Sequence, residues 1–424
     1  MDFTRNRRTL LLIVIVLGSV QIYAQVKPFS LSGYLNAALQ HHPLLSSAEQ
    51  VKASALYGSE AVRQGYYPQI GVASHVVAAP GYDEAVTNGG EIGAQITASY
   101  QLYDGGARSY EIQKAGIGVD QGSLNQDRTR ADIIYSVSAA FAAAVKEKRE
   151  LEVVEQDYRQ LGEYLQLVTQ LHAAGQGDET DVLKTTVELN NVTIDMEARK
   201  TTYANSLMAL AQVAGLSTVE VTDVDTAVQL LSYDTTFAGS RNIDLTTQGL
   251  ALRQAELDAQ IAGAKLRPNI SIGADAGALT SLPNLQPGLP HVFGASLGLS
   301  LTLPLFTFGS IENMYHAAEA TARSISLQND FARSALEHDF SATRNNVERA
   351  GSEIDALQKN LQVAEQSLLL SKARYAGGSG LSLEVLDALR MVNQIRLAIE
   401  EARYQLATSA FKLSRLNYTG VHQE

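Results

Sequence analysis

The sequence repeats one pattern twice, about 200 residues apart, and this duplication limits the possible folds more than any other feature. A segment around Pro68 recurs around Pro268, and a glycine-containing turn near 171–175 recurs near 374–378. Each copy predicts a helix, two alternating strands and two very long helices. We therefore expect one architecture built twice, a mixed α/β protein in which paired strands continue into helical hairpins.

The two copies account for almost the whole chain of 424 residues. We expect a signal peptide at 1–24, a first repeat at 25–216, a linker at 217–240, a second repeat at 241–420 and a tail at 421–424. The first repeat predicts helices at about 30–64, 107–173 and 178–214, with strands at about 67–78 and 91–103. The second predicts helices at about 243–265, 310–376 and 382–418, with strands at about 268–280 and 292–306.

The N-terminus has the pattern of a secretory signal peptide. Arg5, Arg7 and Arg8 precede an apolar run from Leu10 to Val20, and Ala24 supplies a small residue at the expected cleavage point. The alternative, a membrane anchor helix, is disfavoured because the apolar run is shorter than the ~20 residues that a span requires.

The composition excludes several classes of function. A formal net charge of -12 argues against nucleic-acid binding, because phosphate recognition requires a basic face. The absence of cysteine excludes disulfides, thiol catalysis and a lipidated cysteine. The histidines lack chelating spacing, and no phosphate-binding glycine loop or nucleophile elbow occurs. We therefore expect no metal, no cofactor and no enzymatic activity.

The predicted strands alternate between an apolar face and a face of small and polar residues. A soluble sandwich would require larger inward residues than alanine and glycine, whereas this pattern is typical of a membrane barrel. Four strands cannot close a barrel, and an open edge in lipid leaves backbone groups unsatisfied. Two copies would give a barrel of eight strands, whose interior is filled by side chains. Three copies would give a barrel of twelve strands, which is wide enough to leave a passage. An open duct therefore favours a trimer with four strands per chain.

The long helices carry apolar residues at alternating spacings of three and four, a 3.5-residue period that favours coiled-coil packing. An ordinary helical bundle is the alternative. In the first copy this stripe is Leu151, Val154, Tyr158, Leu161, Leu165, Val168 and His172. Each uninterrupted stretch of about 65 residues would extend roughly 100 Å.

Glycines separate the helices of each hairpin, where they are expected to end a helix in a left-handed cap. Asp178 and Ser382 then stand where a side chain could cap the next helix. The turn glycines are Gly175 and Gly177 in the first copy, and Gly377, Gly378 and Gly380 in the second.

Taken together in this order, these motifs resemble the TolC-like outer-membrane efflux family (outer membrane factors). The strand starts at Pro68 and Pro268 take part, and so do the strand ends at 102–106 and 305–309. The most specific match is 374–378 followed by 383–388. The resemblance covers about Leu31 to Leu416.

The resemblance implies a homotrimer with a twelve-stranded barrel in the outer membrane of a Gram-negative bacterium and a helical barrel in the periplasm. It also implies a tip that opens when a periplasmic adaptor (membrane fusion) protein and an inner-membrane pump of RND or ABC type dock. Glu384, Asp387, Asp181 and Tyr375 are then the residues at the periplasmic aperture.

Two features of the predicted tip allow more than one interpretation. Glu384 and Asp387 could instead be solvated acids that favour a helix N-terminus. The chain also departs from family members that place a base two positions after the turn glycine, since Gly380 stands there. Arg374 or Lys184 could substitute.

The sequence thus favours a passive exit duct of a tripartite efflux or type I secretion system. The alternative is a structural or adhesive trimeric stalk anchored in the outer membrane. Such a stalk would predict one terminal strand block and no internal duplication.

Overall fold

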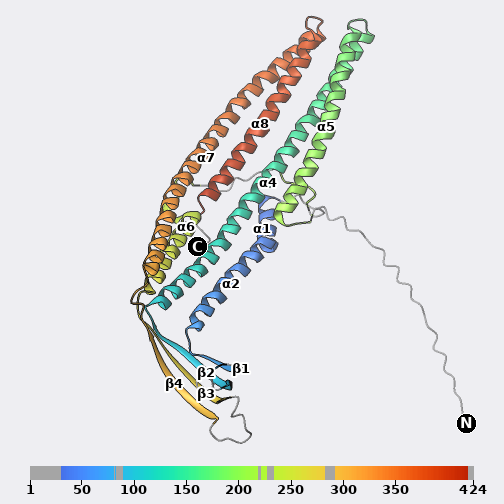
Figure 1. The fold of residues 1–424 in the computed structure, drawn as a ribbon. Helices are drawn as coiled ribbons and strands as arrows, with labels where there is room; N and C mark the ends of the chain where they lie inside the picture. Colours follow the sequence, from blue (N-terminus) through green and yellow to red (C-terminus); the bar gives the residue numbers. More distant parts are fainter. Residues whose placement is uncertain are drawn as a thin grey trace, which may run out of the picture.

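The computed structural model describes residues 30–80, 82, 89–217, 221–226, 234–281 and 292–418. The expected signal peptide and C-terminal tail, as well as parts of the linker, lie outside the described residues. Figure 1 shows a long rod of helices with a small sheet at one end. The elements are α1 Leu31–His41, α2 Pro43–Gly65, β1 Gln69–Ala78, β2 Gly90–Asp104, α4 Ala107–Ala173, α5 Glu179–Ala214, the 3-10 turn η1 Gly239–Arg241, α6 Ile243–Ala264, β3 Asn269–Ser281, β4 Phe293–Thr302, α7 Ser310–Ala376 and α8 Ser382–Leu416.

The sheet joins the two copies, because its strand order is β1-β2-β3-β4 and every neighbouring pair is antiparallel. The register places Ile272 opposite both Tyr100 and Leu299, so the alternating apolar residues of all four strands share one face. That face is uncovered within one chain; Ile70, for example, is 76% exposed. An apolar sheet face of this size requires lipid or protein against it.

A β-bulge changes the alternation near the end of β2. The sequence places Leu102 on the apolar face, but the register shifts between Gln101 and Tyr103. Tyr103 instead lies opposite Ile270, and Leu102 is the extra residue. A bulge adds one residue to one strand, which period-2 counting cannot anticipate.

Prolines account for the strand boundaries that differ from the sequence prediction. Pro68 and Pro268 directly precede β1 and β3 rather than beginning them. The fourth strand ends at Thr302 instead of 306, two residues before Pro304. Proline lacks the N–H that a strand must donate, so the ladder begins after it or ends before it.

The expected first helix, 30–64, is two helices. α1 ends at His41, and α2 begins at Pro43 with His42 as its N-cap. The His42 Nδ1 accepts a hydrogen bond from the Leu44 N–H at 3.1 Å. The reason is local: proline disfavours helical dihedrals in the preceding residue but suits the first position of a new helix.

The two longest helices, α4 and α7, have 67 residues each, and their bounds coincide with the expected ones. At 1.5 Å per residue each extends roughly 100 Å. The stripe expected on α4 is partly wrong, because Tyr158 is 39% exposed and His172 is also exposed. The buried residues there are Val154, Asp157, Leu161, Tyr164 and Val168. α4 packs against both α5 and α8, so two adjacent stripes are covered.

The described part of the linker packs against the middle of the rod. Val221 and Val224 are buried in a core formed with α1, α4 and α5. Between them, the Asp223 carboxylate accepts hydrogen bonds from Lys148 Nζ at 2.6 Å and from the Tyr203 hydroxyl at 2.5 Å. These contacts tie the connection between the copies to the first copy.

Among the helices of the described residues, none combines the length and the apolar run required for a membrane span.

Candidate functional site at the tip of the helical rod

The turns of the two hairpins lie at the same end of the rod, opposite the sheet (Figure 1). Gly175 and Gly378 each have φ +73°, and the residue after each donates its N–H back into the preceding helix. The left-handed caps are therefore confirmed at one glycine per turn. Gly377 has φ -82°, so the prediction of a left-handed cap is wrong for that residue.

The other two turn glycines serve a close backbone approach. A Cβ on Gly177 would lie 3.0 Å from the His172 nitrogen. A Cβ on Gly380 would lie 3.0 Å from both the Arg374 Cβ and the Tyr375 nitrogen. Any side chain at Gly380 would therefore crowd the end of α7. This explains why the base expected there from the family pattern would not fit this turn unchanged.

Tyr375, in the last turn of α7, connects the two hairpins at the tip. Its buried hydroxyl donates to Asp181 Oδ2 of α5 at 3.2 Å. Its ring contacts Tyr164 of α4 edge to face, with centroids 5.6 Å apart. The Tyr164 hydroxyl in turn donates to the buried Ser382 hydroxyl of α8 at 2.9 Å. Four helices thus meet at one aromatic pair.

The electrostatics keep both tyrosines protonated. Burial, followed by the Asp181 charge, raises the pKa of Tyr375. Burial raises the pKa of Tyr164 to about 12, against the opposing effect of its bond to Ser382. Both hydroxyls therefore remain hydrogen-bond donors at physiological pH.

The predicted aperture acids Glu384 and Asp387 lie on the first turns of α8. Arg374 Nη1 forms an ion pair with Glu384 Oε2 at 3.4 Å. Asp387 is 60% exposed and lies 3.3 Å from Arg390. Two bases could replace the one missing at position 380. Arg374 forms the ion pair with Glu384, whereas Lys184 is exposed on α5.

One cross-hairpin contact has no sequence signal. Arg390 of α8 forms two hydrogen bonds of 2.8 Å with the Glu188 carboxylate of α5, 202 positions earlier. A bidentate guanidinium–carboxylate pair is strong and directional. Neither residue belongs to a motif, so only the tertiary structure identifies this contact.

The capping predictions at the two turns have different outcomes. Asp178 is the N-cap of α5, and its carboxylate accepts from the Thr180 N–H at 3.0 Å. Ser382 is not a cap, because Leu381 occupies that position and the Ser382 hydroxyl accepts from Tyr164. The Ser382 hydroxyl, which the sequence predicted to accept from a backbone N–H, instead accepts from the buried Tyr164 hydroxyl.

Apolar packing beneath these polar contacts holds the hairpins together. The cluster contains Leu161, Tyr164, Val168, Ala364, Leu368, Tyr375, Val385, Leu386, Ala388, Leu389 and Val392, with members from α4, α7 and α8. The tip is therefore a packed junction with a few polar connections between hairpins.

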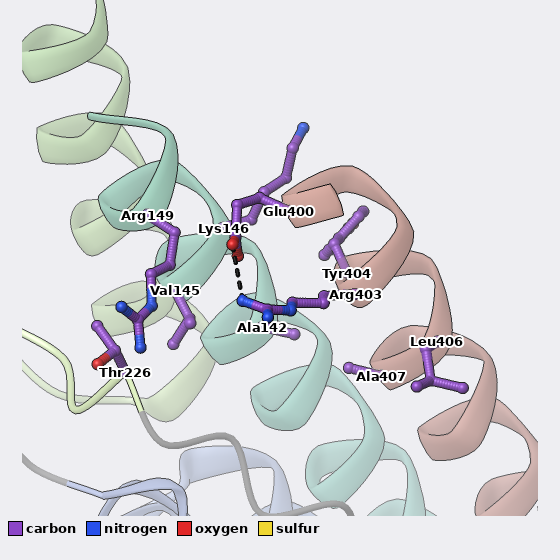
Figure 2. Close-up of a pocket in the computed structure, with 10 residues that line it drawn as sticks. All are labelled: Ala142, Val145, Lys146, Arg149, Thr226, Glu400, Arg403, Tyr404, Leu406 and Ala407. Atoms are coloured by element: carbon purple, nitrogen blue, oxygen red, sulfur yellow. Dashed lines mark hydrogen bonds and ion pairs between the residues drawn. The ribbon is translucent and has the colours of Figure 1, made fainter. Parts of the chain in front are cut away.

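Elsewhere the described residues offer little for chemistry. They contain no group of three or more metal-ligating side chains. A pocket of about 280 Å³ lies between α4 and α8 near the linker (Figure 2). Its three bases each have an acidic partner: Lys146 with Glu401, Arg149 with Glu152, and Arg403 with Glu400. The pocket thus lacks an uncompensated positive charge for an anionic ligand.

Comparison with known proteins decides the family. The family model described as "Outer membrane efflux protein" matches residues 34–216 and 238–417, one match for each copy. The chain belongs to this outer membrane efflux protein family. It is an outer-membrane protein whose helical part is periplasmic, and the family is one of efflux channels rather than enzymes.

Individual relatives are distant but cover most of the chain. The outer membrane protein TolC of Vibrio cholerae serotype O1 is 23% identical over 403 residues, covering 91% of this chain and 89% of that protein. The crystal structure of VceC from Vibrio cholerae has a TM-score of 0.79 at 19% identity, covering 91% of this chain and 94% of that one. The CmeC outer membrane channel of Campylobacter jejuni has a TM-score of 0.80 at 14% identity, covering 93% and 87%. The fold class predicted from the sequence is thereby confirmed.

Proposed function

We propose that this outer membrane efflux protein is the passive, trimeric exit duct of a tripartite efflux or type I secretion system. Its tip would open when a periplasmic adaptor and an inner-membrane pump of RND or ABC type dock. The observation that carries the proposal is the sheet. β1 and β4 are its edges, all ten residues of β4 are exposed, and one face is uniformly apolar.

Closure of the sheet requires further copies of the chain. Unpaired edge strands in lipid would leave N–H and C=O groups without partners. Pairing β4 of one copy with β1 of the next satisfies them, and three copies give twelve strands around a passage. The polar face, on which Asp275 accepts from Gln95 at 3.3 Å and from Ser296 at 2.5 Å, would then line water.

The tip contacts support a gate at the other end. Tyr375 with Asp181, and Tyr164 with Ser382, each connect one hairpin to the other. Separation of the hairpins would break both bonds, so these contacts favour a closed arrangement. Docking of an adaptor would have to supply more free energy than they contribute.

The aperture acids would set ion preference. Three copies of Glu384 and Asp387 near one axis would form an acidic constriction, which favours cations. Their half-exposed side chains are consistent with this position, although Arg374 and Arg390 partly neutralise them. Energy for transport must come from the partner, because the sequence contains no nucleotide-binding motif.

Planar-bilayer recordings of the purified protein test the proposal. Tyr375→Phe removes the bond to Asp181 while keeping the ring, a loss of about 1.5 kcal/mol per protomer. That loss corresponds to a shift of roughly tenfold in the closed-to-open equilibrium, so conductance should rise. The matched control is Tyr158→Phe, which removes the hydroxyl of an exposed tyrosine on α4 and should conduct like the wild type.

A second variant tests the acids and the stalk alternative. Glu384→Gln combined with Asp387→Asn should reduce the preference for cations over anions. A stalk would give no current in any variant, and that result would reject the duct.

A further inference from the structure

Below the tip, α8 presents a row of polar side chains to the first hairpin. Arg390 contacts Glu188, Asn393 contacts Asp157, and Glu401 contacts Lys146. Among them, the Asp157–Asn393 pair is the one whose carboxylate is buried, has no base bonded to it and lies directly between α4 and α8. The pair does not take part in the contacts at the aperture.

The geometry of this pair is incomplete when Asp157 is ionised. Asn393 Nδ2 donates to Asp157 Oδ2 at 2.9 Å. The other amide atom, Asn393 Oδ1, is buried and has no hydrogen-bond partner. An ionised carboxylate can only accept, so it cannot satisfy that oxygen. A protonated carboxyl could donate to it and complete a two-bond ring, and an unsatisfied buried acceptor is costly.

The surrounding charges also favour the protonated form. On α5, Glu188 and Asp195 face Asp157, and Glu188 is already engaged by Arg390. On α8, Arg396 opposes them, but it is bonded to Glu365 of α7 at 2.7 Å. Burial, followed by the Glu188 charge, raises the pKa of Asp157 to about 6.

We infer that the Asp157–Asn393 pair is a proton-sensitive clasp between the two hairpins, which holds the rod more firmly closed as the surroundings become mildly acidic. This inference rests on the proposed function, because it assumes that the hairpins separate when the duct opens.

The sign follows from linkage. When the hairpins separate, Asp157 becomes solvated and regains the ordinary aspartate pKa, near 4. The packed state thus binds a proton more tightly, and its stability rises as the pH falls through about 6 and levels off near 4. Between pH 7 and pH 5 the closed-to-open ratio should increase roughly tenfold per protomer.

The test uses the full-length protein, whose lack of native cysteine allows unique labelling. Spin labels on cysteines introduced at the exposed positions Gln156 and Gln394 report the separation of α4 and α8. In the wild-type background we expect a longer, broader distance distribution at pH 7 than at pH 5. Asp157→Asn, which imitates the neutral acid, should give the short distance at both values. Asn393→Ala, which removes the acceptor for the protonated acid, should give a longer distance at pH 5 than the wild-type background.

Asp195→Asn is the matched control, since it removes one nearby, half-exposed charge without touching the pair. It should retain the pH response, displaced slightly to lower pH. A pH response in Asp157→Asn equal to that of the wild-type background, or no response in that background, would overturn the inference.

Conductance of the same proteins separates this inference from the proposed function. If the channels conduct but neither distance nor current depends on Asp157, the clasp is rejected and the duct stands. If no protein conducts, including Tyr375→Phe, the duct is rejected, and the distances alone decide whether the clasp exists.

Discussion

The two hairpins have nearly the same lengths, with helices of 67 and 36 residues in the first and of 67 and 35 in the second, but they occupy different environments. α4 lies inside the helical layer, covered by α1, α2, α5, α6 and α8, whereas α7 contacts mainly α6 and α8. At the tip this order is reversed, because His172 is exposed at the end of α4 and the equivalent Tyr375 is buried at the end of α7. The two copies thus share a backbone arrangement, but their equivalent side chains have different neighbours.

The tip acids show the same divergence. Asp181 of the first copy accepts from the second copy's Tyr375, while its counterpart Glu384 pairs with Arg374 of its own hairpin. One acid thus connects the hairpins and the other remains within one.

The largest difference in stability is expected between a substitution in α4 and one in α7. Phe141 of α4 is fully buried against Tyr34, with ring centroids 5.9 Å apart, whereas Phe331 of α7 is 76% exposed. Phe141→Ala should cost about 3–5 kcal/mol. Phe331→Ala, at an exposed side chain, should cost much less. Thermal unfolding of both variants in detergent measures the contrast, and equal losses would contradict it.

A smaller effect should distinguish the two strand-to-helix junctions. Gly105 has φ +72°, and a Cβ there would lie 2.4 Å from the Ala264 carbonyl oxygen. Its counterpart Phe308 adopts φ +55°. Gly105→Ala should therefore cost about 2 kcal/mol or more through backbone strain and the clash.

The reciprocal change, Phe308→Gly, should alter stability by less than about 0.5 kcal/mol. Relief of left-handed strain offsets the greater chain entropy of glycine in the unfolded state. The same melting experiment applies, and a large loss in Phe308→Gly would show that the contact of its ring with Phe306, at a centroid distance of 4.3 Å, contributes to stability.

The last contrast concerns helix capping. Asp178 caps α5, but the equivalent Leu381 caps nothing and is exposed. Leu381→Ser should stabilise the second hairpin by about 0.5–1 kcal/mol. Leu383→Ser, which replaces another exposed leucine inside the first turn, should not. If both serines behave alike, surface hydrophobicity rather than capping explains the change.

Periodic patterns in the sequence predicted the helices and strands, but they did not predict the local irregularities within them. Strand faces followed from alternation, because pleating gives every second residue the same side. The β-bulge at 101–103 and the helix break at His42 were not predicted, since each is a change at one position that does not alter the periodicity around it. The stripe on α4 was displaced because two partner helices, not one, cover it.

The candidate site divides in the same way. The turn glycines and the acids of the tip were visible, because their positions follow from repetition and from the resemblance to a family. The partners of those acids were not. Tyr164, Glu188 and Arg390 meet residues about 200 positions away, and no local spacing encodes such distances.

The duplicated helix–strand–strand–hairpin order and the apolar face of the sheet could be predicted from the amino-acid sequence, because both follow from short-range periodicity and backbone chemistry. The residues that connect the hairpins, and the carboxylate buried between them, could be identified only in the folded chain. Those properties depend on how two distant copies pack side by side. The pKa of Asp157 is raised by neighbours and burial that chain folding alone supplies.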